Sequence, residues 1–113
     1  MSIKRGDLFW AELNPVQGSE QAGRRPVLVL QNDIGNEAAP TTIIAPLTTK
    51  SFSKSYPMNV HLAKGIGGIR SPSTVLLSQI RTIDKSRLSG KIGSLSPGYM
   101  EKVNQAVRIS LDL

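Results

Sequence analysis

The side chains available for chemistry in this 113-residue sequence are few, and the missing types exclude several reactions. Without cysteine and with one histidine, His61, the chain offers neither a zinc site of the histidine–cysteine type nor a pair of imidazoles for acid–base catalysis. His61 lies in an alternating stretch and is expected to be an ordinary surface or hydrogen-bonded residue. The eight acidic residues are scattered, whereas two-metal nucleases need clustered carboxylates. A P-loop and a dinucleotide-binding fingerprint are also absent. We therefore expect no metal and no cofactor.

A polar loop between Gly18 and Pro26 carries residues suited to phosphodiester chemistry. When RNA is cleaved by its own 2′-hydroxyl, the protein needs no nucleophile and has only to orient the substrate, move protons and stabilise the transition state. An arginine fork suits the last task because it is permanently charged and grips two phosphate oxygens. Arg24 and Arg25 lie where a strand is expected to begin, with Glu20 nearby in sequence. The sequence alone leaves open that these arginines simply pair with Glu20 at the surface.

The charge distribution favours an anionic partner. The net charge is +6 and the isoelectric point is about 10.1. Between Lys50 and Lys91 the basic residues are opposed only by Asp84, which favours nucleic acid as the partner, with ordinary solvated surface as the alternative. The basic residues do not follow an amphipathic helix, and no apolar stretch approaches the ~20 residues that span a bilayer. Because the N-terminus also lacks a signal-peptide pattern, we predict a cytoplasmic protein without membrane contact.

Short apolar runs separated by Gly, Pro, Ser and Asn predict one mostly β domain over residues 1–113. Strands are predicted over residues 8–13, 26–30, 42–48, 58–62, 74–80 and 87–92. Pro46, inside the third of these strands, predicts an edge position or a bulge. The stretch 16–25 has no core-forming pattern and is expected to be a long loop, while Trp10 is expected to belong to the core.

The end of the chain changes to a helical period. Apolar residues at Met100, Val103, Val107 and Leu111 form one stripe of a helix. Ser96 is suited to cap its first N–H groups, and proline is favoured at the next position. We therefore expect a strongly bent β-sheet or small barrel closed by a C-terminal α-helix, a fold that alone decides no function.

Several segments together resemble the MazF/PemK family of growth-inhibiting toxins, in the family's order and spacing. They are Lys4–Asp7, Leu13–Pro15, Gly18–Gln21, Gly23–Val29, Gln31–Asp33, Ala45–Thr48, Gln79–Lys85 and Arg87–Leu88. The resemblance implies the small SH3-like barrel shared by CcdB, PemK and MazF proteins, assembled as a homodimer. It also implies sequence-specific, metal-independent cleavage of single-stranded RNA, often messenger RNA, to 2′,3′-cyclic phosphate and 5′-hydroxyl ends. The expected protein partner is an acidic, MazE-like antitoxin whose partly disordered segment folds on the basic groove.

Within this resemblance, three residues are the candidates for catalysis. Arg25 precedes the Pro-Val strand and is expected to stabilise the transition state. Thr48, at the end of a later strand, is expected to hold a phosphate oxygen, although it is also an ordinary β-branched strand residue. Glu20 is the candidate base.

Further residues are expected to contact the RNA. They are Ser19, Arg24, Lys50, Phe52, Ser78, Gln79 and Arg81. Gln79 has the alternative of pairing with backbone at a strand end, and Phe52 with Tyr56 are the best candidates for stacking on bases. The sequence departs from many family members at Ser71–Thr74, where they carry Asp-Ser, and at Ser78, where they carry an acid. Base preference is therefore expected to differ from that of relatives.

Two readings without catalysis remain open at this stage. The related CcdB toxins use a similar fold to bind a topoisomerase subunit, and a small basic barrel can also bind RNA and leave it intact. The presence of Arg25 and Thr48 in matching places favours the ribonuclease.

Overall fold

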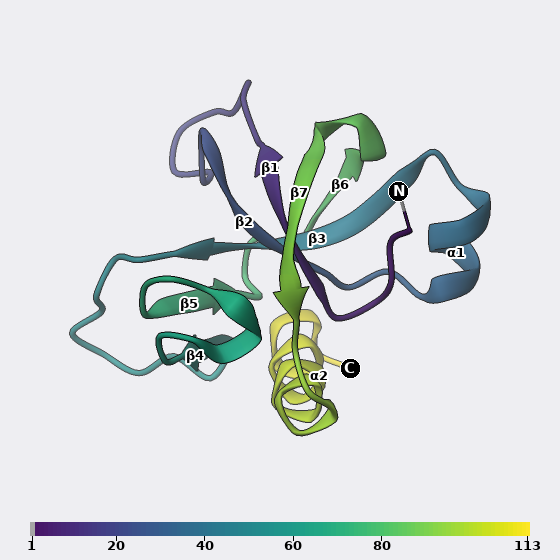
Figure 1. Cartoon of the computed structure of the whole chain (residues 1–113). Helices are drawn as coiled ribbons and strands as arrows, with labels where there is room; N and C mark the ends of the chain where they lie inside the picture. The colour runs from purple at the N-terminus through teal and green to yellow at the C-terminus, as the bar shows by residue number, and fades with distance from the viewer. Residues whose placement is uncertain (1) are drawn as a thin grey trace.

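The computed structural model describes residues 2–113, which form one antiparallel sheet of seven strands with two α-helices (Figure 1). The strands follow the order β4-β5-β3-β2-β1-β7, and β6 pairs with the first half of β3. Their bounds are β1 (Asp7–Glu12), β2 (Arg24–Val29), β3 (Thr41–Thr48), β4 (Asn59–Leu62), β5 (Ser73–Leu76), β6 (Arg81–Asp84) and β7 (Leu88–Ser94). The helices are α1 (Asp33–Ala38) and α2 (Pro97–Leu111), with short 3-10 turns at Ile66–Gly68 and Lys85–Arg87. The predicted fold class, mostly β with a C-terminal helix, is confirmed.

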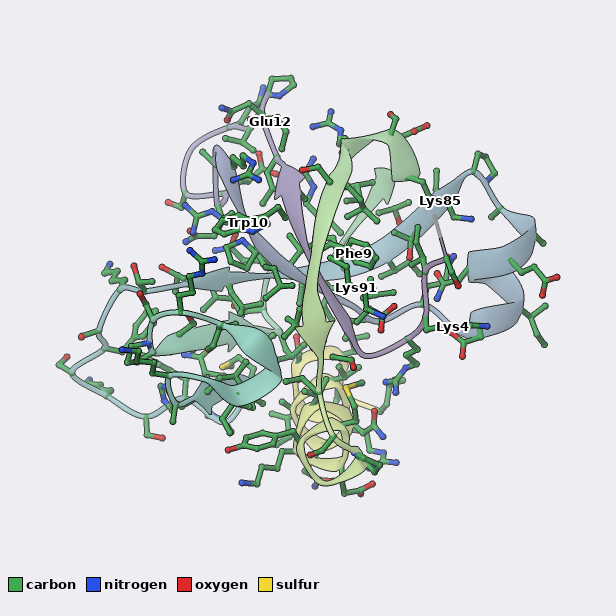
Figure 2. The ribbon with its side chains drawn as sticks, in the orientation of Figure 1. Lys4, Phe9, Trp10, Glu12, Lys85 and Lys91 are labelled. Atoms are coloured by element: carbon green, nitrogen blue, oxygen red, sulfur yellow. The ribbon has the colours of Figure 1, made fainter. Side chains whose placement is uncertain are left out.

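The two faces of the sheet carry separate hydrophobic clusters. Successive side chains of a strand point to opposite faces, so Leu8 of β1 packs with Leu28 and with Val103 of α2, whereas Phe9 packs with Val27 on the other face. Figure 2 shows Phe9 and Trp10 on opposite sides of β1. Helix α2 therefore covers one face of the sheet, while the second cluster fills the other.

The C-terminal helix begins as predicted. The Ser96 hydroxyl accepts the N–H of Tyr99 at 3.3 Å, and Pro97 occupies the first helical position. Val103 of the predicted stripe is fully buried, but Leu111 is 52% exposed, so the stripe covers the core only along its first turns. At 15 residues α2 is the longest helix, and none of the helices within residues 2–113 could span a lipid bilayer.

Strand β3 changes partners at Pro46. On one side it pairs with β2 from Ile44 to Pro46, and on the other it pairs with β6 up to Ile44 and with β5 from Leu47 onward. Proline has no N–H to donate. Pro46 pairs with Val27 of β2, and its nitrogen faces the other side of β3, in the gap between β6 and β5, so no ladder hydrogen bond is lost. The predicted edge position or bulge is thus wrong, because Pro46 lies in a central strand at a change of partner. In Figure 1 the β4–β5 pair and α1 lie at opposite ends of β3.

Other boundaries also differ from the sequence prediction. Strand β2 begins at Arg24, so both arginines belong to the strand and not to the loop. The strand predicted over residues 74–80 ends at Leu76, because the N–H of Gln79 donates to the Leu76 carbonyl and closes a turn. Helix α1 and strand β6 were not predicted, since six and four residues are too short to show a period.

Candidate active site

Arg25 and Thr48 lie on the neighbouring strands β2 and β3. Val27 pairs with Pro46 in an antiparallel register, and two residues further along each strand Arg25 comes opposite Thr48. Arg25 donates through Nη1 to the carbonyl of Leu47 at 3.0 Å and through Nε to the carbonyl of Ala22 at 2.9 Å. Within residues 2–113 its guanidinium makes no further hydrogen bond, which leaves three of its five N–H groups for a ligand. The fold thus holds the head group of Arg25 against β3 with donors to spare.

The hydroxyl of Thr48 is oriented by its own strand end. Thr48 is only 8% exposed, and its Oγ1 accepts the backbone N–H of Lys50 at 3.2 Å. Because a hydroxyl both accepts and donates, this bond leaves the O–H of Thr48 free to donate to a bound oxygen. A threonine hydroxyl that accepts the N–H two residues on is also a common local turn contact, so the catalytic role of Thr48 stays a prediction.

The loop that carries Ser19 and Glu20 is held by hydrogen bonds at its base and at its middle. At its base Leu13 donates to the carbonyl of Gly23 at 3.0 Å, and midway the N–H of Gln21 donates to Oε1 of Gln79 at 2.8 Å. The Glu20 carboxylate accepts the N–H of Gln17, which closes a tight turn at the exposed tip. Gln79 therefore does pair with backbone, as the alternative expected, and in doing so it fixes the position of the loop.

Arg24 and Arg25 do not pair with Glu20. Within residues 2–113 the one ion pair joins Lys91 to Asp7, with 3.3 Å between Nζ and Oδ1. The guanidiniums of the two arginines are therefore not neutralised by a carboxylate, so they contribute a positive potential to this part of the surface. Surface pairing with Glu20, left open by the sequence, is not what the structure contains.

Two adjoining hollows collect most of the predicted site residues. The smaller, about 440 Å³, is lined by Ser19, Glu20, Gln21, Pro46, Ser78, Gln79, Ile80 and Arg81. The larger, about 700 Å³, includes Arg24, Arg25 and Thr48 in its lining. Consecutive residues of β3 line them, Pro46 the smaller hollow and Leu47 the larger. Arg25 bridges them, since it bonds to Leu47 on one side and to the loop at Ala22 on the other.

Trp10 does not lie in the core, where its sequence context placed it. It is half-buried and lines the larger hollow, where the guanidinium carbon of Arg24 lies 4.4 Å from its ring centroid. The expectation of a core tryptophan was wrong because burial falls only along the face of β1 that carries Leu8, Trp10 and Glu12, while Ala11 on the other face stays fully buried. Trp10 shares a face with Glu12, and this alternation was the signal that could have found it.

The remaining predicted contacts lie outside both linings. Phe52 and Tyr56 pack edge to face, with 6.4 Å between ring centroids, and Lys50 Nζ lies 5.8 Å from the Phe52 ring. This small cluster follows the end of β3, just beyond Thr48. Its role in stacking stays a prediction.

Arg81 has a second function in the fold. Its Nη1 donates to the carbonyl of Leu13 at 3.2 Å, at the point where β1 ends. Arg87 adds bonds to the carbonyls of Glu12 and Asn14, at 3.1 and 2.6 Å. These two arginines satisfy consecutive carbonyls that no strand partner reaches, so they support the base of the loop as well as the charge of the site.

Comparison with known proteins gives one consistent family. Residues 4–111 match the family described as the PemK-like, MazF-like toxin of type II toxin–antitoxin systems. The chain is 50% identical over 113 residues to Endoribonuclease EndoA of Bacillus subtilis (strain 168), which covers 100% of this chain and 97% of that relative.

Solved structures agree with this result. The crystal structure of MazF from Deinococcus radiodurans matches with a TM-score of 0.85 at 27% identity, covering 100% of this chain and 99% of that one. A MazE–MazF crystal structure from the same organism matches with a TM-score of 0.77 at 27% identity, covering 100% and 98%. The fold described above is therefore the fold of these toxins.

Proposed function

This chain belongs to the family of PemK-like, MazF-like toxins of type II toxin–antitoxin systems and is an endoribonuclease, and from this premise we propose that it cleaves single-stranded RNA without a metal ion. The observation that carries the proposal is the position of Arg25 opposite Thr48, in a basic hollow, with donors of both side chains unused. Messenger RNA in the cytoplasm is the expected substrate, cut at short sequences.

The proposed reaction is an internal transesterification. The ribose 2′-oxygen attacks the adjacent phosphorus, the bond to the 5′-oxygen breaks, and the products are a 2′,3′-cyclic phosphate and a 5′-hydroxyl. One proton leaves the 2′-hydroxyl and one joins the departing 5′-oxygen. The protein therefore has to align the RNA, move these protons and stabilise the extra negative charge on the phosphoryl oxygens.

The three candidate residues divide these tasks. Arg25 would place its free N–H groups on the phosphoryl oxygens as charge develops, and the Thr48 hydroxyl would donate to one of the same oxygens. Glu20, in the smaller hollow, would accept the proton of the 2′-hydroxyl. This assignment puts the scissile phosphate at the junction of the two hollows and the preceding ribose toward the loop.

The choice of side chains supports the proposed metal independence. Among the residues that the structure describes, no three His, Asp or Glu side chains lie close enough together to hold a metal ion. A permanently charged guanidinium supplies the electrostatic stabilisation that a metal would otherwise give.

The proposal is tested by the products. Purified protein is incubated with a long defined RNA in excess EDTA, and the ends of the fragments are analysed. Cleavage in EDTA with cyclic phosphate and 5′-hydroxyl ends is expected. A requirement for Mg²⁺ or 5′-phosphate ends would refute the mechanism, and intact RNA that is nevertheless bound would favour a passive binding protein.

We propose an acidic antitoxin as the protein partner. The related MazF from D. radiodurans has been crystallised with MazE, and here the un-neutralised arginines beside the apolar wall of the larger hollow suit an acidic segment with apolar anchors. The product of an adjacent gene should compete with RNA for this surface. An acidic neighbour that binds tightly yet leaves cleavage unchanged would contradict this assignment.

A homodimer is expected from the family resemblance. Ile109, Leu111 and Leu113 expose 44, 52 and 83% of their surface at the end of α2, which is an apolar patch of the kind that protein interfaces cover. Light scattering coupled to gel filtration tests this, and a monomer at micromolar concentration would contradict it.

A further inference from the structure

A row of polar side chains crosses four strands of the sheet and includes both catalytic candidates. His61 of β4 pairs with Thr74 of β5, and Thr74 pairs in turn with Thr48 of β3. The β2–β3 register places Arg25 opposite Thr48 at the end of the row. Because residues directly opposite each other in antiparallel strands share a face, all four side chains lie on the same side of the sheet.

The opposite face at the neighbouring positions is entirely apolar. Val60, Val75 and Leu47 form the next row in the same register, and all three belong to the cluster that packs against α2. The polar row is thus the outer side of strands whose inner side makes the core. Thr48 and Thr74 are themselves buried, at 8 and 4% exposure, whereas His61 on β4 is exposed, so the row opens to solvent at its His61 end.

His61 is held in this row by a direct contact. Its Nδ1 lies 2.8 Å from Oγ1 of Thr74, a residue only 4% exposed, whereas the imidazole is exposed. Within residues 2–113 this is the only hydrogen bond of the Thr74 hydroxyl. When that hydroxyl donates to Nδ1, the proton of the neutral ring resides on Nε2. Nε2 is then an oriented donor that has no partner among residues 2–113.

We propose that His61 binds a phosphate of the RNA strand beyond the scissile one, so that the candidate site extends along the polar row onto β4. Neighbouring strands lie about 4.8 Å apart, which places His61 roughly 10 Å from Thr48. At this distance His61 cannot reach the phosphate that Thr48 contacts. It can reach a later phosphate of the same RNA. Thr74 is a positioning residue that fixes the ring. The inference rests on the proposed ribonuclease function.

The contact is a hydrogen bond from imidazole to a phosphate oxygen. Phosphate contacts fix the register of a nucleic acid on a protein without reading its sequence. His61 therefore contributes to binding of RNA that is long enough to reach β4, and not to the bond-breaking step. This contact also defines the path of the RNA across the sheet, from the loop with Glu20 toward β4.

Steady-state kinetics separate this role from a structural one. Two substrates are compared, a dinucleotide that contains the mapped cleavage site and the same site extended on both sides. His61→Ala should raise KM for the extended RNA roughly tenfold, the effect of one hydrogen bond to a charged group, with kcat unchanged and the dinucleotide unaffected. His61→Gln, which keeps a donor, should recover part of the loss. Thr74→Val should show a smaller defect of the same kind. Thr82→Ala, an exposed residue of β6, is the control.

Because His61 is the only histidine, its imidazole also gives a unique NMR signal that does not depend on any variant. A 2′-O-methylated copy of the extended RNA, which lacks the nucleophile, should shift this signal, and the methylated dinucleotide should not. Equal KM values for wild type and His61→Ala on the extended RNA, or an unshifted signal in the bound complex, overturn the inference alone. A wild-type protein that neither binds nor cuts RNA overturns the proposed function and this inference together.

Discussion

The guanidinium carbon of Arg24 lies 4.4 Å from the ring centroid of Trp10, so that a cation of β2 and an aromatic ring of β1 form one wall of the larger hollow. Trp10 is the only tryptophan in the chain, and its emission therefore reports on this wall alone. The first prediction uses this property.

RNA bound in the larger hollow should change the fluorescence of Trp10, because it displaces water from the ring and perturbs the stacked arginine. Arg24→Ala should alter the emission of the free protein and weaken RNA binding several-fold, with little effect on kcat. Titration with uncleavable 2′-O-methyl RNA measures both. If saturating RNA leaves the emission unchanged, the strand does not enter this hollow.

Arg25→Ala should lower the single-turnover rate far more than the affinity. Loss of one preorganised donor to a developing charge typically costs about 10²–10³ in rate, or roughly 3–4 kcal/mol. Arg25→Lys should recover only part of the rate, because a point charge cannot reproduce the planar fork. A folded Arg25→Ala protein that cleaves at nearly the wild-type rate would remove Arg25 from the mechanism, and Arg24→Ala serves as the neighbouring control.

Replacing Thr48 by valine keeps the shape of the side chain and removes the hydroxyl. We expect the cleavage rate to fall by about 10²-fold, since the phosphoryl oxygen loses one donor. Thr48→Ser should retain most of the activity. If valine and serine variants cleave equally well, the hydroxyl takes no part in catalysis.

The salt dependence of RNA binding should identify which cations meet phosphates. Lys50, Lys54 and Arg70 are exposed, and removing each true contact should reduce the log–log slope by about 0.7. Lys85 is different because its ammonium donates to the carbonyl of Asn36, on the side of the molecule where α1 lies (Figure 2). Lys85→Met should therefore leave the slope unchanged. If the Lys50 and Lys85 variants change the salt slope equally, RNA binding depends on the overall positive charge of the protein and not on specific phosphate contacts.

Acid should weaken the fold partly through Asp33. Its carboxylate accepts the backbone N–H of Arg5 at 2.7 Å, and this bond lowers the pKa of Asp33 below its ordinary value of 3.8. A lowered pKa stabilises the fold above the ordinary value, and the contribution is lost as the pH falls through the lowered one. Asp33→Asn should thus destabilise the protein near neutral pH, with a difference that shrinks below pH 3.8. Urea unfolding across this range measures it, and a stability difference that stays constant across the range would show that ionisation of Asp33 does not contribute.

The sequence was enough to predict the fold class, but not the pairing of the strands or the short helix α1. Alternation along the strands and the cap at Ser96 predicted a mostly β domain with a C-terminal helix, and these patterns are local. The partner change at Pro46 was not predictable, because the identity of the neighbour of a strand is a property of the whole sheet. Helix α1 is too short to show a period.

For the site, residue types indicated the chemistry but not the partners. The juxtaposition of Arg25 and Thr48 follows from a register that only the folded sheet defines, although the resemblance had already paired their roles. Arg81 and Lys85 looked equally free in sequence, yet Arg81 donates to the carbonyl of Leu13 after the end of β1 and Lys85 donates to the carbonyl of Asn36 in α1. Which cations stay available depends on such carbonyls, and they cannot be seen in composition.

The change of partner in β3 also bears on how such an enzyme diverges. The β4–β5 pair joins the main sheet through the two ladder positions Leu47 and Thr48, while Arg25 and the Glu20 loop are anchored to β1, β2 and the turn at Gln79. The departures from common family residues at Ser71–Thr74 fall on the side of this pair, which shares few ladder positions with the main sheet and is otherwise held by the core residues Val60 and Val75. Within this stretch Thr74 is bound to the polar row through its pairing with Thr48, but Ser71 and Pro72 precede β5, and mutations there would alter what lies along the proposed RNA path while the aligned catalytic pair is inherited unchanged.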